Sequence, residues 1–324
     1  MLIEIEKSEY VKYFPVPPHP FISEKFIDLN SHKVDQIVWL VDDSGTANMG
    51  LVAGVRNGTI SSPFSAPFGG FHFKKENIYI SEIDRFVNSL EAYAITKDIK
   101  KIEIILPPLI YDGTFNSKVI NSLIRNGYHN HIPELTNWID LTEFEDNFTQ
   151  KNSREYYRQA LRNGLQFSIT ADESEKKMVY DVVAKNRARF GRHIFMTFDD
   201  IIATGELWPV DFFKVTTSSG TLVASAIFYR FYSEICYAVF WGDNEEGRPL
   251  RAMDLLAFNL WSHYKKLGFR YVDLGISTEG GIPNEGLLRF KESHEATSSL
   301  RYKFILDIGK GKSCLSDRKS TRLN

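Results

Sequence analysis

The sequence predicts an α/β (α+β) protein made of two tandem domains, each a mixed central sheet flanked by helices. One observation is a hairpin pattern that occurs twice, with apolar strands on both sides of a turn at Gly45 and again at Gly220. Another is the order of segments after each hairpin, which is the same in both copies: an apolar run, a helix-like segment and a short apolar strand. The two turn glycines are 175 positions apart, which is too long for a solenoid repeat and fits a duplicated domain.

The first domain is predicted to span residues 1–145. Gly127 is expected to end a helix, because glycine readily takes the left-handed conformation found there. The segment 14–21 is expected to be extended, because each of its prolines fixes φ and disfavours helix in the preceding residue. The remaining elements are predicted strands or apolar runs at 36–41, 50–55, 60–68, 102–106 and 138–141, and predicted helices at 26–29, 81–97 and 116–126.

The second domain is predicted to span 146–310 and to be followed by a tail, 311–324. Gly164 is expected to end its first helix, and Pro249 suits the first turn of a later one. The predicted helices are 152–161, 175–189, 198–204 and 249–267, and the predicted strands are 166–169, 211–215, 221–228, 235–241, 271–274 and 300–307.

The last residues of the tail, 317–324, resemble a translated sequencing adapter and are interpreted as an artefact. An authentic basic tail is the alternative. Without these eight residues the formal net charge changes from −2 to −4.

Bulk composition excludes several classes of protein. With 43% hydrophobic and 25% charged residues, the chain has ordinary globular composition. A net charge of −2 does not favour general nucleic-acid binding, so no DNA partner is predicted. The two cysteines exclude a disulfide framework. No apolar run approaches the roughly 20 residues of a membrane span, and the N-terminus shows no signal core, so a cytoplasmic location is expected.

The turn before the predicted helix 249–267 is a candidate anion site. A strand ending at Trp241 runs into a glycine-containing turn, and the N–H groups and positive dipole end of a helix favour a phosphate. Many such turns bind nothing, which is the alternative. The candidate cofactor-binding residues are Trp241, Gly242, Gly247, Arg248 and Arg251.

The first copy has Phe68, Gly69 and Gly70 at the corresponding place, without an adjoining arginine pair. Paired glycines allow close backbone approach. These residues are therefore expected to shape one wall of a substrate pocket.

Two other groups of basic residues allow two interpretations each. Arg154, Arg158 and Arg162 share one helix face, which is either solvated or directed at phosphates. Arg187, Arg192 and His193 form a basic turn, which either holds an anionic acceptor or is simply solvated. Arg158, Arg187, Arg192 and His193 are taken as candidate substrate-binding residues.

Several familiar catalytic motifs are missing from the sequence. It has no GxSxG elbow, no P-loop, no GxGxxG and no His/Cys set with metal spacing. No metal cofactor is therefore predicted.

The motifs that remain resemble the Fem-like branch of the GNAT acyltransferase superfamily, whose members carry two GNAT units in one chain. The resemblance covers about residues 20–307. It is carried by the segments 65–70, 154–160 followed by Gly164, 271–275 and 286–292, in that order and spacing. The sequence departs from the family pattern at Glu295, where the family tends to have glycine, and it lacks room for the helical arm of the peptidoglycan enzymes that use tRNA.

The resemblance implies metal-free transfer of an acyl or aminoacyl group to an amine, and it maps the family's catalysis-linked lysine onto Lys291. Acyl transfer builds negative charge on the carbonyl oxygen, which a donor such as Lys291 would stabilise. Asp273 is a candidate base for the amine, with a structural hydrogen bond as the alternative. Tyr237 is a candidate acid for the leaving group, with a core position as the alternative. Asn284, at the end of the next turn, is a candidate substrate-binding residue.

The sequence therefore predicts an N-acyltransferase that acts on an amine of a small-molecule, polysaccharide or cell-envelope precursor. Acyl-CoA is the expected co-substrate, ahead of aminoacyl-tRNA. A non-catalytic binding or scaffold protein of an envelope or polysaccharide pathway is the alternative.

Overall fold

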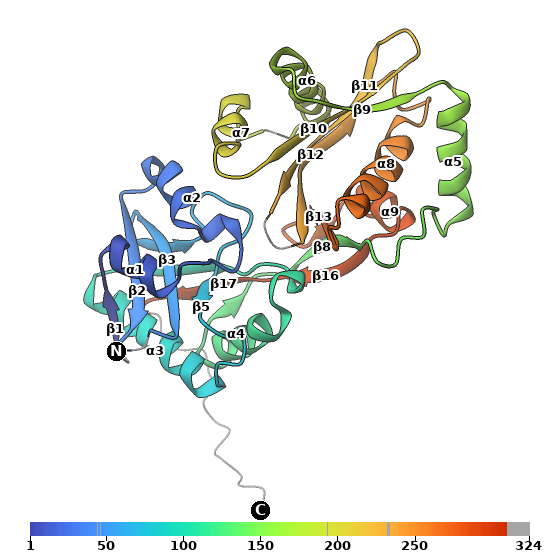
Figure 1. The fold of residues 1–324 in the computed structure, drawn as a ribbon. Helices are drawn as coiled ribbons and strands as arrows, with labels where there is room; N and C mark the ends of the chain where they lie inside the picture. Colours follow the sequence, from blue (N-terminus) through green and yellow to red (C-terminus); the bar gives the residue numbers. More distant parts are fainter. Residues whose placement is uncertain (44, 46, 193, 232–233, 310–324) are drawn as a thin grey trace, which may run out of the picture. The chain divides into compact units, whose positions relative to one another are not determined.

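The computed structural model describes residues 1–43, 45, 47–192, 194–231 and 234–309. Within them the chain forms two compact units. Unit 1 is Met1–Glu134 together with the segment that starts at Ser299, and unit 2 is Leu135–Ser298. Each unit has its own large mixed sheet with helices against it (Figure 1), as the sequence predicted for the fold class.

The sheet of unit 1 has the strand order β1-β2-β3-β4-β6-β17-β7, with β5 also paired to β3. Strands β2, β3 and β4 form an antiparallel meander, and β4 then pairs parallel with β6. The bounds are β1 Leu2–Glu4, β2 Gln36–Asp42, β3 Met49–Arg56, β4 Thr59–Ser62, β5 Phe71–Phe73, β6 Lys101–Ile105, β7 His129–Asn130 and β17 Lys303–Asp307.

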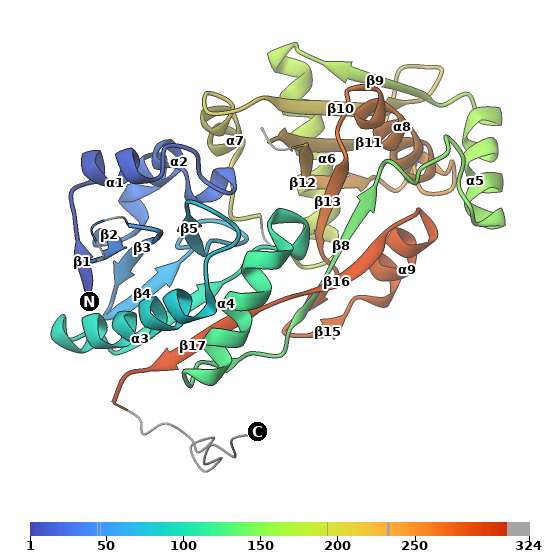
Figure 2. The same cartoon turned by 60° about the horizontal axis from the view of Figure 1, so that its bottom comes forward.

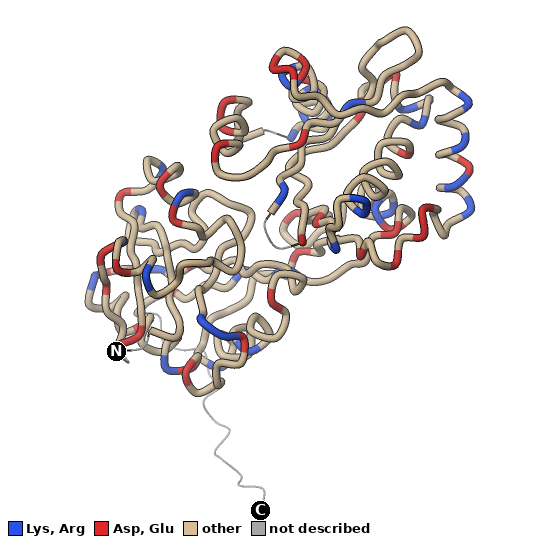
Figure 3. The backbone as a smooth tube through the Cα atoms, in the orientation of Figure 1, with Lys and Arg blue, Asp and Glu red and all other residues tan. Residues whose placement is uncertain are grey.

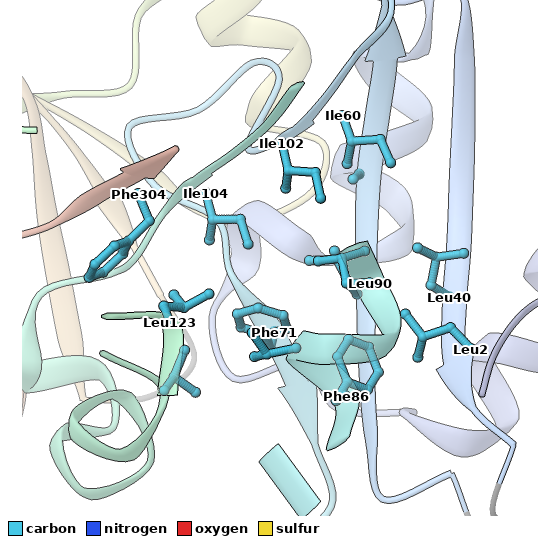
Figure 4. Close-up of a cluster of buried hydrophobic side chains, with 14 of the residues drawn as sticks. Leu2, Leu40, Ile60, Phe71, Phe86, Leu90, Ile102, Ile104, Leu123 and Phe304 are labelled. Atoms are coloured by element: carbon cyan, nitrogen blue, oxygen red, sulfur yellow. The ribbon is translucent and has the colours of Figure 1, made fainter. Parts of the chain in front are cut away.

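The helices of unit 1 cover both faces of this sheet. On one face, side chains of α3 (Ile80–Thr96) and α4 (Gly113–Arg125) pack with Leu40, Ile60 and Ile102 of the strands (Figure 4). On the other face, α1 (Lys7–Tyr13) and α2 (Glu24–Leu29) cover Trp39 and Val52. Short 3-10 turns occur at Pro20–Ile22, Ser31–Lys33 and Leu109–Tyr111.

Unit 2 repeats this arrangement. Its sheet has the order β16-β8-β13-β12-β11-β10-β9, and β10, β11 and β12 form the antiparallel meander before β12 pairs parallel with β13. The bounds are β8 Glu134–Asp140, β9 Gln166–Thr170, β10 Val210–Thr216, β11 Leu222–Arg230, β12 Ile235–Asp243, β13 Tyr271–Ile276 and β16 Thr297–Arg301, with a small separate pair β14 Thr278–Glu279 and β15 Ile282–Pro283.

Strand alternation divides the core of unit 2 between two helical layers. On β10, Phe213 packs with α8 (Ala252–Lys266), whereas its neighbour Phe212 packs with α6 (Glu173–Arg189), so these helices cover opposite faces, as Figure 1 also shows. Helix α5 (Lys151–Arg162) lies against α8, and α7 (Phe198–Thr204) adds Ile201 to the α6 layer. Helix α9 (Glu285–Ser293) comes directly after the β14–β15 pair.

Two predicted strands pair with different partners from those implied by domain boundaries at 145/146 and 310, because unit 1 is discontinuous in sequence. The strand predicted at 138–141 to end the first domain is β8, and it pairs with β13 in the sheet of unit 2. The single strand predicted at 300–307 is two strands, β16 beside β8 and β17 beside β6. Both β16 and β17 are labelled in Figure 2. An apolar strand pattern specifies a buried face but not the neighbouring strand, so the sequence could not assign these partners.

Candidate functional site

The site in unit 2 begins where two parallel strands separate. β12 and β13 are paired only at Ile235↔Tyr271, Cys236↔Val272 and Tyr237↔Asp273. Beyond this point β12 stays with β11 as far as Asp243, with one extra residue in its register after Ala238. β13 has its own irregularity between Asp273 and Ile276. Bulges of this kind redirect strands beside functional sites, and here they open the carboxyl ends of two central strands.

A cavity of about 520 Å³ lies at this opening, in the size range of small-molecule and cofactor sites. It is formed by the end of α6, the end of β12, the turn into α8 and the start of α9. Six residues predicted from the sequence line it: Arg187, Arg192, Trp241, Gly242, Arg248 and Asn284. Asn284 also caps α9, because its side chain accepts a hydrogen bond from the Leu287 N–H at 3.1 Å.

The cavity is electropositive. Its lining has three guanidinium groups and one carboxylate, Asp243. Burial lowers the pKa of Arg187, and the charge of Arg192 lowers it further, so these two cations face a common space. Burial raises the pKa of Asp243, while Arg248 and Arg189 act in the opposite direction, with contacts to Oδ1 at 3.6 and 3.4 Å. The excess of positive charge favours an anionic ligand.

Lys291 of α9 lies behind this cavity and is 1% exposed. Its ammonium group donates to the carbonyl oxygens of Leu274, Gly275 and Ile276 at 2.9, 3.0 and 3.1 Å. These three residues lie at the bulge of β13. An ammonium has three N–H groups, and these three carbonyls take all of them. Burial lowers the pKa of Lys291 to about 7, opposed by the charge of Asp273. The side chain therefore holds the bulge in place.

The two other predicted catalytic residues lie opposite each other on the separating strands. Asp273 is 1% exposed, and its Oδ1 accepts the Gly275 N–H at 2.8 Å, so the structural hydrogen bond considered from the sequence is present. Tyr237 is half-buried, and its ring stacks on Phe231 at 6.0 Å. Ionisation of its phenol would raise the pKa of Arg187, a residue that lines the cavity, so Tyr237 lies near the opening.

Other predicted site residues do not line the cavity. Arg251 takes a left-handed conformation with φ of 67° and lies over the ring of Tyr156 at 3.7 Å. Packing explains why position 247 is glycine, because a Cβ there would collide with the carbonyl oxygen of Val223. His193 lies outside the described residues.

The basic row on α5 is occupied by local partners. Arg154 donates to the carbonyls of Phe148 and Thr149, at 2.8 and 2.6 Å. Arg158 and Arg162 lie near Glu155, at 4.0 and 2.6 Å, and a red segment lies between blue ones along this helix in Figure 3. All three guanidinium groups therefore have partners within unit 2.

The predicted pocket wall of the first copy belongs to the packing of unit 1. Phe68 is 1% exposed, and its ring contacts those of His19, Phe21 and Tyr111. The Gly69 carbonyl accepts a hydrogen bond from His19 Nε2 at 3.0 Å. Gly70 has φ of 107°, which explains its need for glycine.

Sequence reasoning missed the rest of the lining: Asn186, Phe190, Asp243, Met253, Gly286, Leu287 and Phe290. One signal was available for two of them, since Phe190 directly follows α6 and lies four residues, about one helical turn, after Asn186. Asn186 Nδ2 donates to the Asp243 carbonyl at 2.6 Å, which ties that helix to the end of β12.

At Glu295, where the sequence departs from the family pattern, the backbone has φ of 75°. Glycine adopts this conformation without strain, whereas glutamate does so at a cost. The Glu295 carboxylate accepts a hydrogen bond from the Thr149 N–H at 2.7 Å, which offsets part of that cost.

Comparisons with known proteins agree on the fold. No protein-family model matches the chain, and no curated protein is significantly similar to it in sequence. The crystal structure of FemX matches with a TM-score of 0.66 at 12% identity, over 94% of this chain and 97% of that one. L-PGS from Bacillus licheniformis matches with a TM-score of 0.58 at 12% identity, over 93% and 92%. A C-terminal DUF2156 domain from Agrobacterium fabrum matches with a TM-score of 0.56 at 14% identity, over the same shares.

These similarities confirm the predicted fold. The chain shares the fold of these structures over almost its whole length, with two units that each have a mixed sheet and flanking helices, as expected from the resemblance to Fem-like tandem GNAT proteins.

The described part of the chain lacks two other features. No helix within it combines the length and apolar character needed to cross a membrane. Nor do three or more His, Cys, Asp or Glu side chains come together there as a metal-binding group.

Proposed function

We propose that this protein is an N-acyltransferase that binds an anionic acyl donor in the cavity of unit 2. The observation that carries the proposal is the cluster of Arg187, Arg192 and Arg248 around a cavity at the separating ends of β12 and β13. Bidentate guanidinium groups suit phosphate oxygens, and Trp241 and Phe290 add an apolar wall for the remainder of a donor. The FemX and L-PGS likeness supports the class of reaction.

Acyl-CoA is the donor we propose ahead of aminoacyl-tRNA. The volume of the cavity, about 520 Å³, and its three arginines suit the anionic part of a single donor molecule. The basic row on α5, which would have been a surface for a longer polyanion, is paired with Glu155 and with backbone carbonyls. Transfer then needs no metal. The amine nitrogen attacks the thioester carbonyl, the carbon–sulfur bond breaks, and the amine loses one proton while the thiolate gains one.

In this proposal Tyr237, half-buried beside the opening, gives its proton to the leaving thiolate and regains one from the amine nitrogen. Asp273 and Lys291 fix the backbone of β13 that borders the transferred group. Lys291 therefore acts by positioning the backbone of β13. The acceptor is an amine of a small-molecule or cell-envelope precursor, and we propose a cytoplasmic location for the reaction.

The test is calorimetric titration of the full chain with acetyl-CoA and CoA, followed by detection of free thiol with a panel of primary amines. Arg187→Ala/Arg192→Ala should abolish measurable binding, and Arg158→Ala, an exposed arginine outside the cavity, is the matched control. Binding without thiol release for any amine would favour the non-catalytic binding protein. No binding of either compound, with activity that is lost on ribonuclease treatment, would point to aminoacyl-tRNA instead.

A further inference from the structure

A second cavity lies in unit 1, on the face of the sheet that α1 and α2 cover, and the proposed acyl transfer does not use it. Its volume is about 200 Å³. The rings of Tyr10, Phe14 and Trp39 line it, together with Pro15 and Pro17 of the segment predicted to be extended. An apolar cavity of about 150 Å³ accepts a benzene molecule. This cavity therefore has room for one six-membered ring with a small substituent.

The polar side chain of His72 of β5 is also part of this lining. It is 3% exposed, and its Nδ1 lies 2.9 Å from the Tyr10 hydroxyl. The Tyr10 side chain is itself 1% exposed, and Nδ1 is the acceptor that the described residues offer to its O–H. A buried hydroxyl without an acceptor costs about 1–3 kcal/mol. The hydroxyl therefore donates to Nδ1, which places the imidazole proton on Nε2.

The Nε2–H group is available to a ligand. Within the described part of the chain Nε2 makes no hydrogen bond, yet it is not among the fully enclosed polar atoms that lack a partner. Since His72 lines the cavity, this N–H is accessible from it. Burial lowers the pKa of His72 to about 3, so the ring is uncharged at neutral pH. Burial also raises the pKa of Tyr10. The base of the cavity therefore offers a neutral donor and no charge.

A glycine in the neighbouring strand leaves room for the contact between Tyr10 and His72. Gly50 of β3 pairs with His72, and a Cβ on Gly50 would lie 2.6 Å from both the Tyr10 hydroxyl and the Phe14 ring. The rings of Tyr10 and Phe14 can reach His72 only because this position has no side chain. Charged groups, Glu24 and Lys25, occur on the α2 side of the cavity, where Glu24 lies 3.5 Å from Lys7.

We propose that this cavity binds a neutral single-ring ligand that carries an oxygen acceptor, such as an aryl ketone or aldehyde. The ring packs against Trp39 and Phe14, and the ligand oxygen accepts the hydrogen bond from His72 Nε2. An ionised ligand is disfavoured, because no opposite charge lies at the base to replace its hydration. A ligand without an acceptor leaves the Nε2–H unpaired.

Two isosteric probes test the proposal, because acetophenone has a carbonyl where α-methylstyrene has a methylene group. Each is titrated into the full chain while the Trp39 indole and His72 ring signals are followed by NMR. Both signals should shift in a saturable way, and acetophenone should bind roughly 3- to 10-fold more tightly, as expected for one hydrogen bond.

Two variants locate the effect. Tyr10→Phe/His72→Phe removes both polar partners while keeping ring volume, so the two probes should then bind equally. Val11→Trp, at a lining position, should abolish binding of both. The proposal is overturned if acetophenone shifts neither signal, or if the wild-type chain binds both probes equally. It is also overturned if the double variant, folded by its NMR spectrum, keeps the preference. Should that variant not fold, the wild-type comparison decides alone.

Discussion

The buried ammonium of Lys291 makes the stability of unit 2 depend on pH in a calculable way. The pKa of Lys291 is about 7 in the folded chain, against a usual value of 10.5. Between these values the unfolded chain binds the proton and the folded chain does not, so stability rises with pH. The gain in stability that comes from deprotonation of Lys291 is fully present above pH 10.5 and is lost as the pH falls to about 7. From pH 7 to pH 9, the expected gain from this one group is about 2 kcal/mol.

Lys291→Met removes the titrating group and keeps a side chain of similar length. We expect the free energy of unfolding of the wild type, minus that of the variant, to increase by about 2 kcal/mol from pH 7 to pH 9. Urea unfolding followed by tryptophan fluorescence measures this difference, and four of the five tryptophans, all except Trp39, lie in unit 2. Lys266→Met, at an exposed position on α8, controls for the loss of a lysine. A difference that stays constant across this pH range would refute the reasoning, because the three carbonyls would then compensate the burial of the charge completely.

Three further changes test the site and its support. Arg248→Ala should weaken acetyl-CoA binding about 10- to 100-fold in calorimetry, since hydrogen bonds to charged groups contribute about 1.5–3 kcal/mol, and an unchanged affinity would remove Arg248 from the donor site. Gly247→Ala should lower the free energy of unfolding by more than about 1 kcal/mol in urea, because the added Cβ meets the Val223 carbonyl, and wild-type stability would contradict this packing. Asp254→Ala leaves the Nε2 of buried His294 without the carboxylate that lies 3.0 Å away, so a loss of about 1–3 kcal/mol is expected, and wild-type stability would contradict the pairing.

Elements with strong local signals could be predicted from the sequence. The helix predicted at 198–204 is observed as Phe198–Thr204, because Thr197 and Asp200 form a capping box that fixes its start. The helix predicted from Pro249 starts instead at Ala252. Arg251 before it is left-handed, and Gly247 to Arg251 form a turn that propensity alone does not reveal.

The arginines of the candidate site could be predicted from the sequence, whereas most of its apolar residues could not. A cluster of arginines near a turn is visible in a sequence, and three of those predicted line the cavity. The apolar lining residues Met253 and Phe290 look like any core residue on a helix, since a ligand wall and a core face have the same periodicity. The three carbonyl partners of Lys291 depend on the bulge of β13, which has no sequence signal of its own.

Because unit 1 takes its strand β17 from the end of the described chain, the order in which the chain can fold during synthesis is constrained. β6 pairs with β17, although about 200 residues separate them, and all of unit 2 is translated in between. One backbone edge of β6 therefore stays unpaired while unit 2 is synthesised. Ile102 and Ile104 gain their partners in β17, the last strand described in the chain, only afterwards. A ribosome that stalls within unit 2 would release a first unit with an open sheet edge, which is a species prone to aggregate.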